Sequence, residues 1–291
     1  MKDKLTHDEI RELSTRGAAI WLRDAVVDWL IIGLSFYLFN FWMHPVSFLV
    51  LLLVIGNRQH ALAVLGHEAS HFRLSENKRV NDLLANLGAF WSLGITTSGY
   101  RSLHNKHHSH TNTEQDPELA HRGARAPQWD LPISIFKILR FCAEDLIGFS
   151  YKDYLIIITF SKPNSSKEYF YLFAFHVMLT MALVITGLWW VPAIWYIALF
   201  TSFMMFFRLR TFLEHLGTED THRLYLTWLE RQVMAPHNIW YHWEHHKYPT
   251  VPYYRLPEIR HLLQDVPVQT LSNLISFYGN CQPYKSGEVL K

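Results

Sequence analysis

The sequence predicts an all-α integral membrane protein, with four transmembrane helices arranged as two hairpins and a cytosolic helical cap. Three observations carry this prediction: the length of the apolar stretches, the placement of charge along the chain, and clusters of histidine. The 291-residue chain is 49% apolar, with a mean hydropathy of +0.01 and a net charge of +2. These averages are ordinary for a soluble protein, so the prediction depends on how the residues are distributed. We expect one domain over residues 1–291.

The apolar stretches come in two pairs. A transmembrane helix needs about 20 mostly apolar residues. The first and third stretches supply this length directly, and the second and fourth reach it if their helices continue. The polar segments 66–168 and 211–291 then form the expected cap. The four expected spans are residues 25–43, 46–65, 170–190 and 193–210.

The charges show which ends of these helices lie together. All 27 Lys and Arg residues fall within residues 1–23, 57–168 and 208–291. The two connectors, Asn40–Pro45 and Gly187–Pro192, have no charged residue. This is the distribution of the positive-inside rule, so we expect a multi-pass protein with both termini and the cap in the cytosol. The alternative, a soluble bundle with four buried helices, gives no reason to remove charge from one end only.

Two further segments are apolar without being candidate spans. Residues 83–95 are too short to cross and predict a re-entrant or surface helix. Residues 132–149 place apolar side chains on one helical face, a pattern typical of a helix that lies in the interface. Two cysteines exclude a disulfide scaffold, and the near-neutral charge gives no basic stripe for nucleic acid.

Histidine is the outlier, with 18 residues. Eight of them form three clusters in which residues lie three or four apart. On a helix such residues share one face, so each cluster projects its imidazoles into one space, as a metal site requires. The clusters are His67 and His71; His104, His107 and His108; and His242, His245 and His246.

Eight histidines are too many for one ion, because a tetrahedral site takes about four ligands and an octahedral site about six. Two neighbouring ions are the economical account. Imidazole binds iron, zinc, copper and nickel alike, so the ligands leave the metal open. His215 is a candidate ninth ligand. If the second and fourth spans continue as helices, His67 stands about 18 Å and His215 about 12 Å beyond the apolar core.

These residues resemble a known family, the membrane-bound fatty-acid desaturases with their hydroxylase and carotenoid ketolase relatives. The likeness covers roughly residues 46–257, and the second box with its tail looks like the bacterial branch. It implies a di-iron centre that activates dioxygen, with His215 similar to a histidine that ends the fourth span of acyl-CoA desaturases. The family's three histidine boxes are matched, in the expected order, by His67-x-x-x-His71, His104-x-x-His107-His108 and His242-x-x-His245-His246.

The resemblance implies an oxidoreductase that introduces a C=C bond into a fatty acyl chain or similar apolar substrate. Its cofactor would be two Fe²⁺ ions, with no catalytic residue apart from the metal centre. Electrons are expected from a separate ferredoxin or similar carrier and its reductase. The expected location is a bacterial inner membrane. Two alternatives stay open. One is a hydroxylase or ketolase that acts on a carotenoid or other small molecule. The other is a metal transporter or sensor, which should carry its ligands near the bilayer midplane.

Three more residues are expected beside the ligands. Asp116 would hydrogen-bond a ligand ring, and His237 and Asn238 would support a ligand or hold a water. Asp116 follows the second box, and His237 and Asn238 lie about one turn before the third. An ordinary turn cap is the alternative for Asp116. Glu68 and Glu244 stand inside boxes but should point away from the metal, into salt bridges within the cap.

Overall fold

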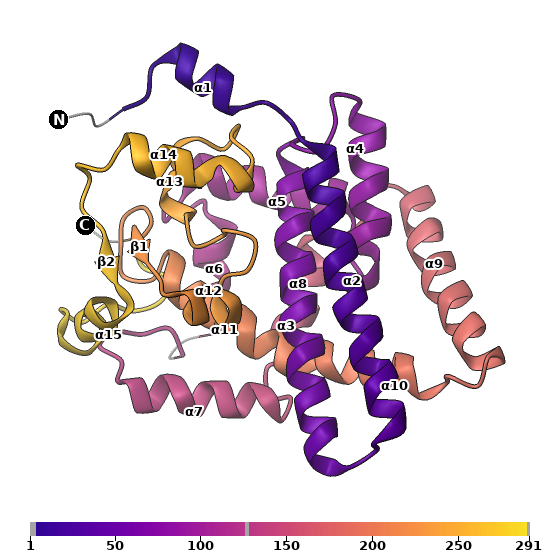
Figure 1. Ribbon diagram of the computed structural model, residues 1–291. Coiled ribbons are helices and arrows are strands. Elements are labelled where there is room, and N and C mark those ends of the chain that lie inside the picture. The colour runs from indigo at the N-terminus through magenta and orange to yellow at the C-terminus, as the bar shows by residue number, and fades with distance from the viewer. Residues whose placement is uncertain (1–3, 126–127, 290–291) are drawn as a thin grey trace. The chain divides into compact units, whose positions relative to one another are not determined.

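The computed structural model describes residues 4–125 and 128–289 (Figure 1). In these residues the chain is almost entirely helical, with one two-stranded parallel sheet. It divides into two compact units, and the single domain expected from the sequence stays a prediction. The long-helix unit comprises Gly17–Ser102 and Glu144–Phe207, and the histidine unit comprises Met1–Arg16, Leu103–Ala143 and Arg208–Lys291.

The long-helix unit contains the apolar stretches. Its elements are α2 (Ala18–Phe41), α3 (Pro45–Ser70), α4 (Lys78–Ala85), the π-helix η1 (Asn86–Phe90), the 3-10 helix η2 (Trp91–Leu93), α8 (Tyr151–Phe160), α9 (Ser166–Ile185) and α10 (Trp190–Phe200). Three helices begin in one unit and end in the other, namely α5 (Thr97–His110), α7 (Ile135–Leu146) and α11 (Ser202–Glu214).

Three segments of the described chain are long and apolar enough to cross a membrane: Pro45–Ser70, Ser166–Ile185 and Trp190–Glu214. They correspond to three of the four expected spans, and the four-span arrangement stays a prediction. The last span continues to Glu214 over 25 residues, as expected, with one interruption. Thr201 takes φ −123° and ψ −91° and separates α10 from α11.

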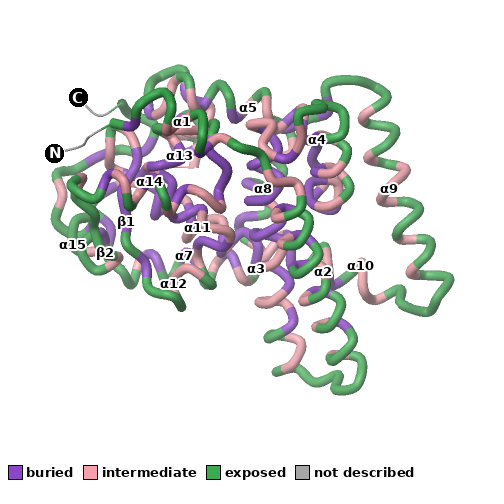
Figure 2. The backbone as a smooth tube through the Cα atoms, turned by 45° about the horizontal axis from the view of Figure 1, so that its top comes forward, coloured by how far each residue is buried: buried purple, intermediate pink, exposed green. Residues whose placement is uncertain are grey.

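The surroundings of α9 indicate lipid. All of its residues are described and none of them is buried (Figure 2), yet an 18-residue window of it has a mean hydropathy of 1.7. A helix that is apolar all round is normally buried in a core or in a membrane. Because α9 leaves large apolar side chains such as Phe170 and Phe173 exposed, lipid is the environment that suits this surface.

The core of the long-helix unit forms around α3, against which α2, α4, η1 and α10 pack. Two glycines allow close approach. A Cβ at Gly56 would lie 2.2 Å from Ser202 Oγ, and one at Gly66 would lie 2.3 Å from the Phe90 ring. No larger residue fits at either position without a shift of its neighbour.

The segment 83–95 forms the end of α4, η1 and η2. Phe90 and Leu93 are buried. The Nε1–H groups of Trp29 and Trp195 donate to the carbonyls of Gly88 and Ser92, at 2.7 and 3.0 Å. One side of the segment therefore packs inside the long-helix unit, whereas Leu83 and Leu87 are 52% and 48% exposed. Its placement as a re-entrant or a surface helix stays a prediction.

The histidine unit is built from short elements. These are α1 (His7–Leu13), α6 (Pro117–Ala124), α12 (Trp228–Met234), α13 (His242–Lys247), the 3-10 helix η3 (Tyr253–Arg255), α14 (Leu256–Leu262) and α15 (Leu271–Asn280), with β1 (Leu224–Tyr225) parallel to β2 (Gln269–Thr270). Leu224 pairs with Gln269 and Tyr225 with Thr270.

The helix expected within residues 132–149 is α7. Its residues divide between two environments, because Ile138 and Cys142 are buried whereas Phe136 is 80% and Leu139 56% exposed. The exposed side thus carries large apolar residues, as an interfacial helix does. Its place at a membrane surface stays a prediction.

Candidate metal centre

The second histidine cluster lies on α5, where helical spacing turns its rings to one side. His104 and His107 are buried and His108 is half-buried. After the helix, Asn112 takes φ +55°, a backbone conformation that asparagine tolerates better than most residues. Its backbone N–H donates to Asp116 Oδ2 at 2.8 Å. This bond fixes the direction in which the chain leaves the cluster.

The third cluster lies on α13, and His215 follows the last residue of α11. α13 has only six residues, so little more than one turn carries all three rings. His242 and His245 are buried and His246 is half-buried. His215 is also buried, with its Nδ1 2.9 Å from the backbone oxygen of Asp220.

Four ring nitrogens meet in a group that we call site A. Nε2 of His215 lies 3.1 Å from Nε2 of His107 and 2.8 Å from Nε2 of His242. The ligand atoms of all four residues lie within 4.8 Å of one another. The members of site A are His107, His215, His242 and His246.

The hydrogens on these rings show why the short separations at site A need a cation. His107 directs Nδ1 to the Asp116 carboxylate at 3.0 Å, and His215 directs Nδ1 to the Asp220 carbonyl. Both oxygens only accept, so each neutral ring carries its hydrogen on Nδ1 and presents a bare lone pair at Nε2. Two lone pairs at this distance repel each other. Nitrogens bound at about 2.1 Å to one ion lie about 3 Å apart at a right angle, so the separation fits a shared metal ion.

A second group, site B, lies beside site A. Nε2 of His108 is 2.9 Å from Nε2 of His104 and 3.1 Å from Nε2 of His245. The rings of His108 and His246 stack with centroids 4.2 Å apart. The histidine unit therefore brings together seven of the nine predicted ligands in two neighbouring groups.

The other two predicted ligands, His67 and His71, lie in the long-helix unit. They stand at the C-terminal end of α3 with ring centroids 5.3 Å apart. Glu68 does not point away from the box as expected. Its Oε1 lies 3.5 Å from His67 Nδ1, because the last turn of α3 brings the two neighbours together.

Burial and the neighbouring charged groups together shift the pKa of these rings. Burial, and then the nearby His107, lower the pKa of His108 to about 3. Burial likewise lowers the pKa of His215 well below its usual value. For His107 burial acts in the same direction, but Glu118 and Asp116 outweigh it and raise the pKa. Neutral imidazole is the form that binds metal, and a carboxylate at Nδ1 increases the basicity of the ligand.

Asp116 lies where the sequence predicts it, with Oδ1 at His107 Nδ1. The same oxygen accepts the backbone N–H of Glu118 at 2.9 Å and caps α6. Asp116 therefore makes both contacts that the sequence offered as alternatives: it caps a turn, and it contacts a predicted ligand ring. Its role at a metal stays a proposal.

Asn112 is a residue that sequence reasoning passed over. Its side-chain amide donates to the backbone oxygens of Thr218 and Asp220, at 2.8 and 3.0 Å. Its Oδ1 accepts from Arg122 Nη2 at 2.5 Å. Asn112 thereby ties the end of the second box to the loop that follows His215.

Glu214 is the second residue that was missed. Its Oε1 lies 3.3 Å from His242 Nδ1 and 2.5 Å from Arg210 Nε. A signal was available, because Arg210 and Glu214 are four residues apart on one helix face and Glu214 directly precedes His215. The buried carboxylate borders site A with its charge balanced by the guanidinium.

Glu244 points away from the metal sites, as predicted. Its carboxylate is buried between two guanidiniums, with Arg223 Nε at 2.7 Å and Arg260 Nε at 2.8 Å. The expected salt bridge is confirmed. It anchors α13 to the strand β1 and the helix α14, and so supports the third box from behind.

His237 and Asn238 form the turn before the third box, both with positive φ. Asn238 Nδ2 donates to the Tyr253 carbonyl at 3.3 Å, and the His237 ring packs edge-on against Tyr253 with centroids 5.9 Å apart. These contacts shape the backbone that leads into α13. Their predicted role beside the ligands stays a prediction.

The sequence is similar to proteins of known activity. The model of a family described as fatty acid desaturase matches residues 40–276. Dihydrorhizobitoxine desaturase of Bradyrhizobium elkanii is 26% identical over 256 residues, which cover 78% of this chain and 70% of the relative. Delta(8)-fatty-acid desaturase of Borago officinalis is 25% identical over 274 residues, 78% of this chain and 58% of the relative. A shorter match, 29% identical over 90 residues, is to the Delta 8-(E)-sphingolipid desaturase of Kluyveromyces lactis and covers 31% of this chain and 15% of that protein.

The matched region contains all three histidine boxes and His215. Desaturases are oxidoreductases, and together with three apolar helices of spanning length the likeness indicates a membrane protein. The family model covers far more than half of the sequence. The chain therefore belongs to the fatty acid desaturase family.

Proposed function

We propose that this protein is a di-iron, dioxygen-dependent desaturase that introduces a C=C bond into a fatty acyl chain or a similar apolar substrate. The observation that carries the proposal is site A, where the Nε2 atoms of His107 and His242 both lie close to Nε2 of His215, at 3.1 and 2.8 Å. Imidazole suits several first-row metals. Membership of a desaturase family favours iron among them.

We assign His67 and His71 to site B, whose three ring nitrogens are fewer than the four to six ligands that a metal ion usually takes. Arg101 supports this assignment. It lies on α5 one turn before His104, and its Nε donates to the carbonyl of Ser70 at 2.8 Å, next to His71. The helix of the second box is thereby tied to the end of the first.

The iron ions, when bound, supply redox chemistry in which dioxygen, two electrons and two protons remove two hydrogens from adjacent carbons and end as two waters. The chain's own part is to hold the rings and to keep water out. Asp116 and Glu214 orient the rings of His107 and His242 through Nδ1, the arrangement that strengthens metal-binding histidines. A separate ferredoxin or similar carrier, with its reductase, would deliver the electrons.

The topology belongs to the same proposal. Four spans in two hairpins would place the uncharged connectors on one side and every Lys and Arg on the other, which is the cytosol by the positive-inside rule. Both termini and the metal sites would then face the cytosol, in a bacterial inner membrane. This orientation gives a soluble electron carrier access to the histidine unit.

The test compares lipids from bacteria that express the chain together with a ferredoxin and its reductase. We expect a product lighter than its precursor by two hydrogens with the wild type, and none with His107→Ala. His261→Ala is the matched control, because His261 is exposed on α14 and should leave the product unchanged. A product heavier by one oxygen would overturn desaturation in favour of hydroxylation. Fewer than two irons in each purified, active chain would overturn the di-iron assignment.

A further inference from the structure

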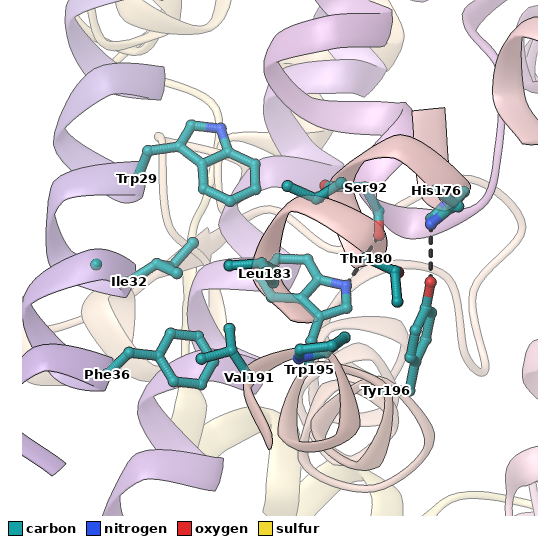
Figure 3. A pocket seen from close by; sticks show the side chains of 13 residues that line it. Trp29, Ile32, Phe36, Ser92, His176, Thr180, Leu183, Val191, Trp195 and Tyr196 are labelled. Carbon is teal, nitrogen blue, oxygen red and sulfur yellow. Dashed lines mark hydrogen bonds between the residues drawn. The ribbon is translucent and has the colours of Figure 1, made fainter. Parts of the chain in front are cut away.

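A cavity of about 240 Å³ lies within the long-helix unit between α2, α9 and α10 (Figure 3). Ile32 and Phe36 of α2 line one side, and Leu179 and Leu183 of α9 line the other. Pockets for drug-sized ligands measure about 300–1,000 Å³. This smaller, apolar space suits one hydrocarbon chain better than a bulky ring system.

Helices α2 and α9 leave this space open, although the apolar residues that line it on each helix are four residues apart, as residues that pack between helices often are. Residues four apart on neighbouring helices normally interlock as ridges and grooves. Here α9 rests mainly on η2 and α10, and its apolar side chains turn to the cavity instead. An apolar occupant would restore the contacts that the two faces do not make with each other.

One polar pair, His176 of α9 and Tyr196 of α10, is part of the cavity lining. The Tyr196 hydroxyl lies 2.8 Å from His176 Nδ1, as the dashed line in Figure 3 shows. His176 is the eleventh of the 20 residues of α9, so it lies about 15 Å from each end and near the centre of a span. Polar side chains at that depth are costly and usually mark a site.

The depth of the pair decides what kind of polar group it can meet. A charged headgroup is unfavourable near the bilayer centre. The His176 ring is hydrogen-bonded to the Trp91 backbone as well as to Tyr196, so the oxygen of Tyr196 is the atom left to accept. A hydroxyl group is neutral and can donate to it. The apolar lining beyond the pair then takes the chain of the same molecule.

The cavity and the first histidine box occupy different ends of the long-helix unit. The apolar end of the cavity, at Phe36 and Leu183, lies within about two helical turns of the uncharged connectors. His67 lies at the end of α3 that is remote from the connector of residues 42–44. The cavity thus lies nearer the leaflet of the uncharged connectors than the predicted iron ligands do.

We propose that this cavity binds a neutral, single-chain lipid with a hydroxyl group, which enters from that leaflet and places its hydroxyl at Tyr196 and His176. This site goes beyond the proposed desaturase function, since its binding needs neither iron nor turnover. Its occupant stabilises the long-helix unit by filling the space between α2 and α9.

Gly33 makes the proposal testable. It lines the cavity, and a Cβ built there meets no described atom within 4 Å. Gly33→Leu therefore fills the space without a clash and also favours the helix, because glycine is a poor helix former. The matched control is Leu34→Phe, which adds bulk at the neighbouring position of α2, where Leu34 is 56% exposed.

The experiment uses hexadecanol and hexadecane as probes, with the full chain in detergent and without reductant or dioxygen. Native mass spectrometry counts bound molecules, and thermal unfolding reports the stabilisation that binding produces. Wild type and Leu34→Phe should bind one hexadecanol and melt at a higher temperature. Gly33→Leu should lose both effects while keeping its helical circular dichroism.

Tyr196→Phe tests the hydroxyl separately. It should reduce the preference for hexadecanol over hexadecane by about 5-fold, the value of one ordinary hydrogen bond. Equal binding of the alcohol and the alkane to the wild type would overturn the assignment of a hydroxyl lipid. Unchanged hexadecanol binding by Gly33→Leu would overturn the site itself.

Discussion

The histidine unit and the long-helix unit use polarity in opposite ways. The histidine unit buries polar groups, among them His107, His215 and Glu244. The long-helix unit exposes large apolar ones, such as Leu30 at 65% and Phe173 at 68%. Buried rings with facing lone pairs need a cation inside, and an apolar exterior needs an apolar solvent outside. The difference indicates that the histidine unit needs a bound cation and that the long-helix unit needs lipid around it.

Both units also bury charge, but with different support. In the histidine unit Glu244 lies between Arg223 and Arg260, and Arg223 also donates to the Leu263 carbonyl at 3.0 Å. In the long-helix unit Asp28 and Arg58 form a pair at 2.8 Å, in which Asp28 is buried. A network shares the cost of burial among several groups. A pair depends much more on each partner.

The largest effect is expected at the centre of site A. His215 contacts the Nε2 atoms of both His107 and His242, so His215→Ala removes a nitrogen shared by both short separations. We expect loss of desaturation and more than about 100-fold weaker iron binding, beyond the 10–100-fold effect of residues that only support a ligand. Iron content after dialysis and product analysis measure these losses.

A histidine of the same loop is the matched control. His222 is buried and its Nε2 donates to the Leu216 carbonyl at 2.7 Å, outside sites A and B. His222→Ala should lower the melting temperature yet retain iron. Equal loss of iron from both variants would mean that the loop, and not the nitrogen of His215, controls the metal.

The candidate site was more predictable from the sequence than its surroundings. The box histidines are found by spacing, because helical periodicity alone places residues three and four apart together. His215 and Asp116 follow from their position after a span and before a proline. The spacing of Arg210 and Glu214 indicates an ion pair, but it does not reveal the contact of Glu214 with His242, which depends on how α11 meets α13.

The fold departs from the sequence-based expectations where packing decides. The break at Thr201 has no glycine or proline to announce it, and at that point Ser202 Oγ donates to the Leu52 carbonyl of α3. His176 lies in none of the three histidine clusters. Its partner Tyr196 is 20 residues away on another helix, so no short-range motif could reveal the pair.

The next largest effect is expected at the buried pair of the long-helix unit. Arg58→Met leaves the Asp28 carboxylate buried without its guanidinium and should cost about 3–5 kcal/mol. Thermal unfolding in detergent measures the loss. The double variant Asp28→Leu with Arg58→Met should recover most of it, because an apolar pair has no charge to desolvate. Failure of the double variant to recover would show that shape, rather than charge, governs this contact.

A smaller effect is expected from the carboxylates that support site A. Glu214→Gln and Asp116→Asn keep the size of the side chain but remove the charge at the Nδ1 atoms of His242 and His107. Each should weaken iron binding about 10–100-fold while leaving the seven rings of the histidine unit in place. Competition with a metal chelator measures the affinity. Glu219→Gln, at an exposed position of the same loop, is the control and should bind iron as the wild type does.

The smallest effect is expected on the outer surface of α9. Phe173→Ala removes a ring that is 68% exposed, so it should change the stability in detergent by no more than about 0.5 kcal/mol. The matched variant, Phe212→Ala, removes a ring that is only 4% exposed and packs on Trp129, and should cost about 3–5 kcal/mol. Thermal unfolding of both variants makes the comparison. A comparable loss at Phe173 would show that α9 packs against protein, and the contrast between a lipid-facing unit and a metal-centred one would then be wrong.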